Sequence, residues 1–310
     1  MSASTDSVDG VVIIDKPSGW TSHDVVAKVR NLVKAKKVGH TGTLDPFATG
    51  VLPLTLGRAT RLTNYFLASD KVYHGVMRFG FATTTYDVDG EPLGVDTHPE
   101  LDSTRLEEIL GRYRGTIHQT LPPYSAKKLQ GRPLYSYARK GIEVAPSTKT
   151  VTIKSLKLLG VYQSEAEFEL ACSAGTYARS LAHDIGADYG SGAHLVRLRR
   201  TRSGDFPIEA AVPLSEGDRF HPRDFLLSRL IPLRDLLREF PAITISDGDK
   251  NKLLHGMDLN LLTADWESEE FRLLDTSGEL IALARRIQVF QPPVPQPARW
   301  MRLHPHITFG

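Results

Sequence analysis

The chain has 310 residues, of which 41% are apolar and 24% charged, and its formal net charge is +2 at pH 7. This is the composition of an ordinary soluble protein that can bury a substantial core without covalent cross-links. The single cysteine, Cys172, excludes an internal disulfide bond. The polar N-terminus lacks a signal-peptide pattern, and no apolar run approaches the roughly 20 residues that span a bilayer. We therefore expect a cytoplasmic protein that does not enter a membrane.

The first 80 residues alternate between apolar segments and a glycine-rich loop. Residues 11–14 form a β-branched run that predicts a buried strand. A helix should follow, because Thr21 or Ser22 can cap it and apolar residues then recur at helical spacing. Residues 39–57 are rich in glycine and proline, which predicts a structured loop that leads into a short strand. Residues 72–80 alternate between apolar and polar side chains and predict a second strand.

The middle of the chain mixes strands and helices without a regular strand–helix–strand repeat. Residues 151–162 and 165–173 predict two paired strands, and residues 177–189 predict a helix. This order favours the α+β class, with a mixed and largely antiparallel sheet, over a doubly wound fold.

The domain organisation is predicted from changes in composition. We expect residues 1–10 to be disordered and residues 11–240 to form the main domain, which ends in a proline-punctuated stretch. Residues 241–294 predict a small β domain with a hairpin around Thr276–Gly278. The proline-rich tail, residues 295–310, has no pattern that assigns it a structure.

The loop around Asp45 is the strongest candidate for chemistry. Pro46 restricts Asp45 to extended backbone angles, and the neighbouring glycines allow a ligand to approach the backbone closely. An aspartate held in this way suits nucleophilic or proton-abstracting work. The alternative is an Asp-Pro turn closed by a side-chain hydrogen bond, which the residues alone do not exclude.

Other classes of site leave no pattern in the sequence. Cysteine pairs and the H-E-x-x-H motif are missing, and so are the glycine motifs of nucleotide-binding loops, so we expect neither a metal nor a cofactor. Basic residues do cluster, which suits a localised site for a polyanion, although solvated surface is an equally simple explanation. The clusters are Lys34, Lys36 and Lys37; Lys127, Lys128 and Arg132; and Arg197, Arg199, Arg200 and Arg202.

Five long segments of the chain form a recognisable series. They are VVIIDKPSGWTSHDVV, GHTGTLDPFATGVLPLTLGRAT, KVYHGVMRFGFATTTYDVDG, LPPYSAKKLQGRPLYSYARKGIEV, and CSAGTYARSLAHDIG with GAHLVRLRRTRSG. In this order they resemble the TruB-type bacterial tRNA pseudouridine synthases, and the segment around Asp45 resembles the motif that carries the catalytic aspartate of that family. Together they extend over most of residues 11–206, so the resemblance covers most of the predicted main domain.

The resemblance implies roles for individual residues. Asp45 matches the catalytic aspartate, Tyr73 the tyrosine that packs on the target base, and Arg179 the arginine that pairs with the aspartate. Leu198 matches the apolar residue that closes the pocket, and Lys16 belongs to a motif that supports the catalytic loop. The residues expected to contact RNA are His40, Tyr177, Leu198, Lys16, Lys127, Arg199 and Arg200.

The resemblance also implies an activity and a fold. The expected reaction is the isomerisation of uridine 55 in the T-arm of tRNA, by a monomer with a pseudouridine synthase catalytic domain and a PUA-like C-terminal domain. This chemistry needs an ionised carboxylate in a dry pocket, and a guanidinium beside it would oppose the rise in pKa that burial causes. Two alternatives remain at this point: an RNA-binding protein without activity, and a carbohydrate hydrolase whose second carboxylate is Asp87 or Asp184.

Overall fold

The computed structural model describes residues 8–122, 128–129, 132–133, 147–214, 223–263, 267–290 and 299–310. Most of the predicted disordered segment, residues 1–7, lies outside this range, as does Lys127. Residues 8–10 are ordered, because Asp9 accepts a hydrogen bond from the backbone of Arg58 and Gly10 begins the first strand. None of the described helices is long and apolar enough to cross a membrane.

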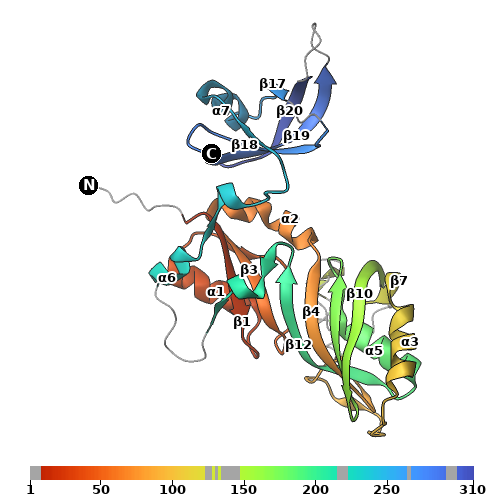
Figure 1. Ribbon diagram of the computed structural model, residues 1–310. Helices are drawn as coiled ribbons and strands as arrows, with labels where there is room; N and C mark the ends of the chain where they lie inside the picture. The colour runs from red at the N-terminus through yellow and green to blue at the C-terminus, as the bar shows by residue number, and fades with distance from the viewer. Residues whose placement is uncertain are drawn as a thin grey trace.

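A large mixed sheet forms the main domain (Figure 1). Its described strands pair antiparallel except where β1 meets β14 and where β3 meets β12. Along the sheet the order is β14 (Val212–Pro213), β1 (Gly10–Lys16), β3 (Thr49–Leu56), β12 (Ala193–Ser203), β4 (Lys71–Phe79), β11 (Glu165–Cys172), β10 (Thr148–Tyr162) and β7 (Gly115–Thr120). Three short strands pair with members of this sheet outside that order. They are β2 (Val38–His40) on β3, β13 (Phe206–Pro207) on β12 and β15 (Ile231–Pro232) on β1.

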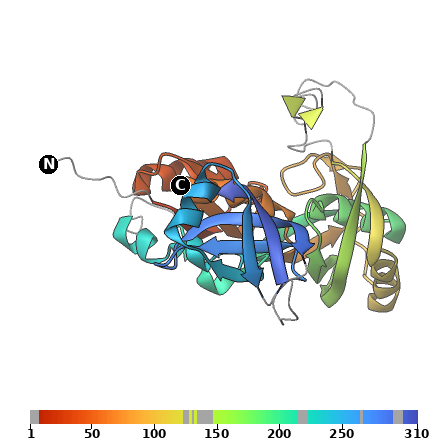
Figure 2. The same ribbon diagram turned by 90° about the horizontal axis from the view of Figure 1, so that it is seen from above.

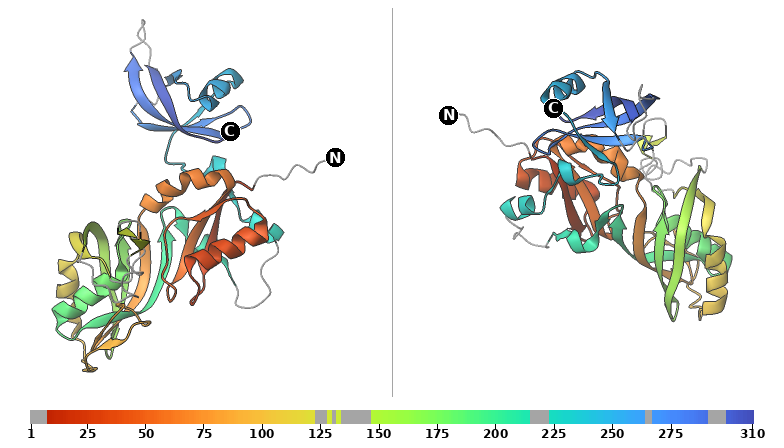
Figure 3. Two further views of the ribbon diagram at one scale, coloured as in Figure 1. Left: turned by 180° about the vertical axis from the view of Figure 1, so that it is seen from behind. Right: turned by 45° about the horizontal axis from the view of Figure 1, so that its top comes forward.

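Two helices, α1 (Ser22–Val33) and α5 (Ala178–Tyr189), pack on one face of this sheet (Figure 3). Thr21 is the N-cap of α1, in a capping box with Asp24, and Ser22 is the first helical residue. The apolar residues Val25 and Val29 of α1 and Leu181 of α5 lie in the same core cluster. The predicted strands and helices of the main domain are therefore confirmed, with ends that differ by at most three residues.

The remaining elements are shorter. The helices are α2 (Thr63–Ala68), α3 (Ser103–Arg112) and α6 (Arg223–Ser228), with 3₁₀ turns η1 (Gly57–Leu62), η2 (Ile208–Ala210) and η3 (Leu233–Asp235). Two small hairpins pair β5 (Ala82–Thr83) with β6 (Pro92–Leu93), and β8 (Lys128–Leu129) with β9 (Arg132–Pro133).

A second sheet forms the C-terminal unit. Its order is β16 (Ala242–Thr244), β18 (Glu270–Leu274), β19 (Leu280–Phe290), β20 (Arg299–Thr308) and β17 (Leu259–Thr263), and α7 (Asp247–Leu254) completes it. The turn between β18 and β19 is the predicted hairpin at Thr276–Gly278. Residues 299–308, placed by sequence in a separate tail, are instead the strand that joins β19 to β17. The domain boundary predicted at residue 294 therefore falls inside this sheet.

The two sheets share an apolar interface. Seen from above, the C-terminal sheet lies over the end of the main domain that carries β1 and β3 (Figure 2). Leu280, Leu283 and Phe309 belong to one buried cluster with Val11 and Ile13 of β1. The C-terminal unit thus does not cover the face of the main sheet on which α1 and α5 pack. A site can form on that face.

Candidate active site

Asp45 lies in the loop between β2 and β3, and buried polar groups hold this loop in place. The ammonium of Lys16, which is fully buried, donates to the carbonyl oxygens of Pro46 at 3.0 Å and Trp20 at 2.6 Å. The hydroxyl of Ser22 accepts from the amide of Leu44 at 2.9 Å. Lys16 therefore braces the loop, and its burial corrects the expectation that it contacts RNA.

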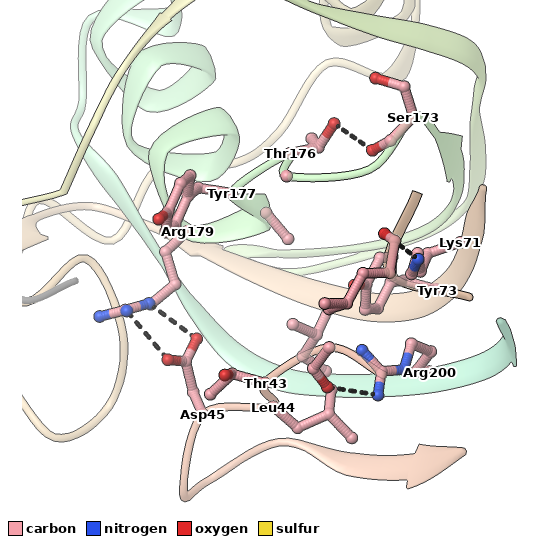
Figure 4. Close-up of a pocket in the computed structure, with 15 residues that line it drawn as sticks. Thr43, Leu44, Asp45, Lys71, Tyr73, Ser173, Thr176, Tyr177, Arg179 and Arg200 are labelled. Atoms are coloured by element: carbon pink, nitrogen blue, oxygen red, sulfur yellow. Dashed lines mark hydrogen bonds and ion pairs between the residues drawn. The ribbon is translucent and has the colours of Figure 1, made fainter. Parts of the chain in front are cut away.

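An ion pair connects Asp45 with Arg179 (Figure 4). Nη2 of Arg179 donates to Oδ1 of Asp45 at 2.9 Å, and Nε lies 2.9 Å from Oδ2. Arg179 is in the first turn of α5 and its side chain is 6% exposed, whereas that of Asp45 is 32% exposed. The carboxylate thus has one side held by a buried guanidinium and another open to the pocket.

Asp87 is a third member of this charged group. Nη1 of Arg179 donates to Oδ2 of Asp87 at 3.1 Å and to the carbonyl oxygen of Thr85 at 3.1 Å. Asp87 is 3% exposed and lies in the turn after β5. Sequence analysis named Asp87 only as a possible second carboxylate of a hydrolase, because nothing in the sequence links it to Arg179, 92 residues away.

The surroundings of Asp45 set its ionisation. Burial raises the pKa of the Asp45 carboxyl, the Arg179 guanidinium lowers it, and the negative charge of Asp87 raises it again. The net direction is upward from the ordinary value. One guanidinium therefore serves two carboxylates, and Asp45 keeps its charge less easily than it would with Arg179 to itself.

A cavity of about 260 Å³ opens beside Asp45. Tyr73 from β4 and Leu198 from β12 line it, and the N-cap residue of α5, Tyr177, closes one end. Figure 4 shows Asp45 and Arg179 on one side of this pocket and Tyr73 and Arg200 on the other. Among the described residues, the pocket lining thus combines two tyrosine rings, several apolar side chains and one carboxylate, that of Asp45.

Arg200 has a different position from the one expected of an RNA-contacting residue. It is 1% exposed and donates to the carbonyl oxygens of Val51 at 2.7 Å and Gly42 at 3.0 Å. Burial raises the pKa of the nearby Tyr73 hydroxyl, and the charge of Arg200 opposes that rise. Arg200 therefore fixes the back wall of the pocket instead of following a phosphate backbone.

Two other residues that were expected to contact RNA, Arg199 and His40, are not in the lining of the pocket. Arg199 forms a two-point ion pair with Asp15, at 2.7 and 3.0 Å, so its charge is already compensated. His40, at the end of β2, is half-buried and meets His23 edge-on with ring centroids 5.7 Å apart. Burial and the charges of His23 and Arg200 lower the pKa of His40, which favours a neutral ring.

Sequence analysis missed one further buried cation. Lys71 is 5% exposed, lines the pocket, and donates to the carbonyl oxygens of Phe66 at 3.1 Å and Leu67 at 2.9 Å, at the end of α2. Burial lowers the pKa of Lys71 to about 8. The only signal in the sequence was its place two residues before Tyr73. Among the described residues, no group of three or more acidic, histidine or cysteine side chains could hold a metal ion.

Comparisons with known proteins identify the family. The model of the TruB family pseudouridylate synthase N-terminal domain matches residues 30–178, and that of the tRNA pseudouridylate synthase B C-terminal domain matches residues 179–221. A tRNA pseudouridine synthase B of Solibacter usitatus is 41% identical over 89% of this chain and 95% of its own length. One from Chromobacterium violaceum is 42% identical over 87% of this chain and 88% of its own.

The chain belongs to the TruB family of pseudouridylate synthases. It is therefore an isomerase. Among solved structures, the archaeal box H/ACA Nop10–Cbf5 complex matches with a TM-score of 0.66 and 25% identity, over 96% of this chain and 85% of that one. An H/ACA ribonucleoprotein bound to a substrate RNA shares the fold with a TM-score of 0.69, at 24% identity over 98% of this chain and 86% of that one. The α+β prediction and the recognition of the family are confirmed.

Proposed function

We propose that this TruB-family chain isomerises uridine 55 in the T-arm of tRNA, with Asp45 as the essential carboxylate. The observation that carries the proposal is the Asp45–Arg179 ion pair at the floor of the pocket. The substrate is proposed from the relatives, which are named tRNA pseudouridine synthase B. The proposal includes a cytoplasmic location and a monomeric state.

The pocket residues suit the steps of this isomerisation. The target uridine must leave its stack, because the glycosidic bond is hidden inside one, and it can then pack on the ring of Tyr73. Burial raises the pKa of Asp45 and Arg179 opposes that rise, so the guanidinium favours the ionised carboxylate, and Leu198 helps exclude water while the base is detached. After the base rotates and rejoins through C5, the Tyr73 hydroxyl can relay the C5 proton to solvent, giving up its own proton as it takes the one from C5.

The geometry disfavours the hydrolase alternative. A glycoside hydrolase needs two carboxyl groups that flank the scissile bond. Asp87 is 3% exposed, and its carboxylate already accepts hydrogen bonds from Arg179 and Thr85. Asp184 does not line the pocket that Asp45 faces. Asp45 is thus the one aspartate in the lining of this pocket within the described part of the chain.

A tritium-release assay tests the proposal. The substrate is a T-arm stem-loop RNA with tritium at C5 of its uridines, and release is followed for the wild type and for Asp45→Asn. We expect release by the wild type and none by Asp45→Asn, with RNA affinity retained because the substituted amide keeps the size of the carboxyl.

A matched RNA with cytidine at position 55 controls for the site of reaction. Release that continues from the cytidine-55 RNA would place the reaction at another uridine. Equal release by Asp45→Asn and the wild type would disprove the role of Asp45. Binding without release by the wild type would disprove the T-arm as substrate.

A further inference from the structure

Tyr86 lies between the two residues that hold Arg179 on the side away from the pocket. The carbonyl oxygen of Thr85 and the carboxylate of Asp87 both accept from Nη1 of Arg179, each at 3.1 Å. Tyr86 itself does not line the pocket beside Asp45. Any effect of Tyr86 on the reaction must therefore pass through the turn that it belongs to.

The backbone of Tyr86 is strained. Its φ is 66°, in the left-handed region that a bulky side chain rarely occupies. Hydrogen bonds close the turn around it: the hydroxyl of Thr83 donates to the carbonyl oxygen of Asp87 at 2.7 Å, and the amide of Asp89 donates to its carboxylate at 3.1 Å. Strained residues persist where the surrounding contacts compensate for them, and they concentrate at functional sites.

The ring of Tyr86 supplies such a contact. It stacks on the imidazole of His183 with centroids 3.8 Å apart and planes at 17°. His183 follows Arg179 by four residues on α5, so both side chains project from the same face of that helix. The stack thus joins the Asp87 turn to the helix that carries Arg179.

His183 contributes to the stack with Tyr86 through the face of its ring. Its buried Nδ1 has no hydrogen-bond partner within the described residues, and burial lowers its pKa, which favours a neutral ring. A neutral ring with an unpartnered nitrogen makes no directional polar contact there, so stacking is the interaction that the pair offers.

We propose that Tyr86 and His183 are positioning residues, whose stack holds the Asp87 turn against α5 and so fixes the guanidinium of Arg179 toward Asp45. The proposal rests on the proposed role of the Asp45–Arg179 pair. It assigns a function to an aromatic pair outside the pocket.

The first test compares Tyr86→Phe, which keeps the stack, with Tyr86→Ala, which removes it. Single-turnover tritium release at saturating enzyme should fall about 10- to 100-fold in Tyr86→Ala, because small displacements of catalytic groups have effects of this size. Tyr86→Phe should stay within about threefold of the wild type, and the dissociation constant for the RNA should stay within about twofold in both. Equal rates in the two variants would overturn the proposal.

Tyr86→Gly separates the ring from the backbone strain. Glycine adopts a positive φ freely, so this variant should unfold at a higher urea concentration than Tyr86→Ala and yet react as slowly. It also carries the test if Tyr86→Ala does not fold. Recovery of the wild-type rate in Tyr86→Gly would show that the ring has no role.

Partner substitutions test the route of the effect. His183→Phe, which keeps a stacking ring, should retain the rate, and His183→Ala should lose it. In an Asp87→Ala background, which already lacks the side-chain contact with Arg179, Tyr86→Ala should slow the reaction by less than about twofold further, because both changes act on the same contact of Arg179. Fully multiplicative losses would contradict action through Asp87.

A wild type that releases no tritium would contradict the proposed function and not this inference. Crystal structures of the wild type and Tyr86→Ala then decide the inference alone. Displacement of the Arg179 guanidinium from Asp87 in the variant would support it, and an unchanged guanidinium would overturn it.

Discussion

At the scale of single residues, burial raises the pKa of Asp45, and the charges of Arg179 and Asp87 then act on it in opposite directions. A carboxylate with a raised pKa becomes protonated as the pH falls through that pKa, so the reaction should lose rate on the acid side. Asp87 contributes to the rise. The pH dependence of the reaction rate is therefore sensitive to Asp87, although Asp87 does not line the pocket.

Asp87→Asn should move the acid limb of the rate profile to lower pH. Its amide can still accept from Arg179, but the negative charge that raises the pKa of Asp45 is gone, so Asp45 stays ionised at lower pH. The measurement is the single-turnover rate from about pH 4.5 to 8, normalised to each variant's plateau.

Asp184→Asn is the control for this profile. Burial and the charge of Asp188 raise the pKa of Asp184 to about 6, so it also titrates within the range, but it does not line the pocket. Its substitution should leave the acid limb in place. If the acid limb moved in Asp184→Asn and stayed in place in Asp87→Asn, the limb would report the ionisation of Asp184 and not that of Asp45. This prediction would then be wrong.

Lys16→Met should destabilise the protein and slow the reaction. Methionine keeps the length of the side chain but leaves the carbonyl oxygens of Trp20 and Pro46 without their donor. Buried unsatisfied groups of this kind cost about 1–3 kcal/mol each, so the free energy of unfolding should fall by about 3 kcal/mol. Urea denaturation measures it, with the exposed Lys37→Met as the matched control, which should change stability by less than about 0.5 kcal/mol.

At the scale of elements, strands with one buried face were predictable and strands with unusual composition were not. Along β11, buried and half-exposed residues alternate, and this alternation is visible in the sequence. β20 was missed because Pro305 lies within it and its histidines obscure the period. Its pairing with β19 also includes two register shifts.

The candidate site, like the strands, was predictable only in part. The pairing of Asp45 with Arg179 was expected from the resemblance together with the need for an ionised carboxylate, and the two side chains do meet. The position of Asp87 was not predictable, because it depends on a turn stacked against a helix far along the chain. Arg200 was expected to contact RNA because it belongs to a basic cluster, whereas the strand alternation buries it.

Gly50→Ala should disrupt the junction of β3 and β12. Gly50 has a φ of 102°, and a Cβ there would lie 2.2 Å from the carbonyl oxygen of Arg200. The control is Gly19→Ala, which has a φ of 81° but meets no atom within 4 Å. We expect Gly19→Ala to cost about 1–2 kcal/mol from backbone strain alone and Gly50→Ala clearly more, measured by urea denaturation. Equal losses would show that the close approach to β12 is not important.

At the scale of the whole molecule, the C-terminal sheet is bound to the main domain by apolar and polar contacts. Tyr65 of α2 donates to Glu270 of β18 at 2.7 Å. Arg58 and Arg61 donate to the carbonyl oxygens of Phe309 and Thr308. Together with the shared apolar cluster, these contacts predict that the two units unfold together.

Phe309→Ala should lower the stability of both units at once. Phe309 is 1% exposed in the cluster that also contains Val11 and Ile13. Truncation of a buried phenylalanine costs about 3–5 kcal/mol, so calorimetry should show one transition, lowered by about 5–10 °C. Trp300→Ala, near the start of β20, the strand that ends just before Phe309, is 42% exposed and should shift it far less. Two separated transitions in Phe309→Ala would mean that the units are not coupled.

The order of strands in the main sheet also governs how the protein can be made. β12 lies between β3 and β4, yet it follows them in the chain by more than a hundred residues. During synthesis, the facing edges of β3 and β4 therefore have no partner strand until β12 has left the ribosome. At typical elongation rates this delay is on the order of ten seconds. Asp45 and Tyr73 are translated early, but the parallel contact that fixes Gly50 forms only after Arg200 is made. A nascent chain that stalls before residue 203 therefore leaves the facing edges of the apolar strands β3 and β4 unpaired. It requires protection from aggregation.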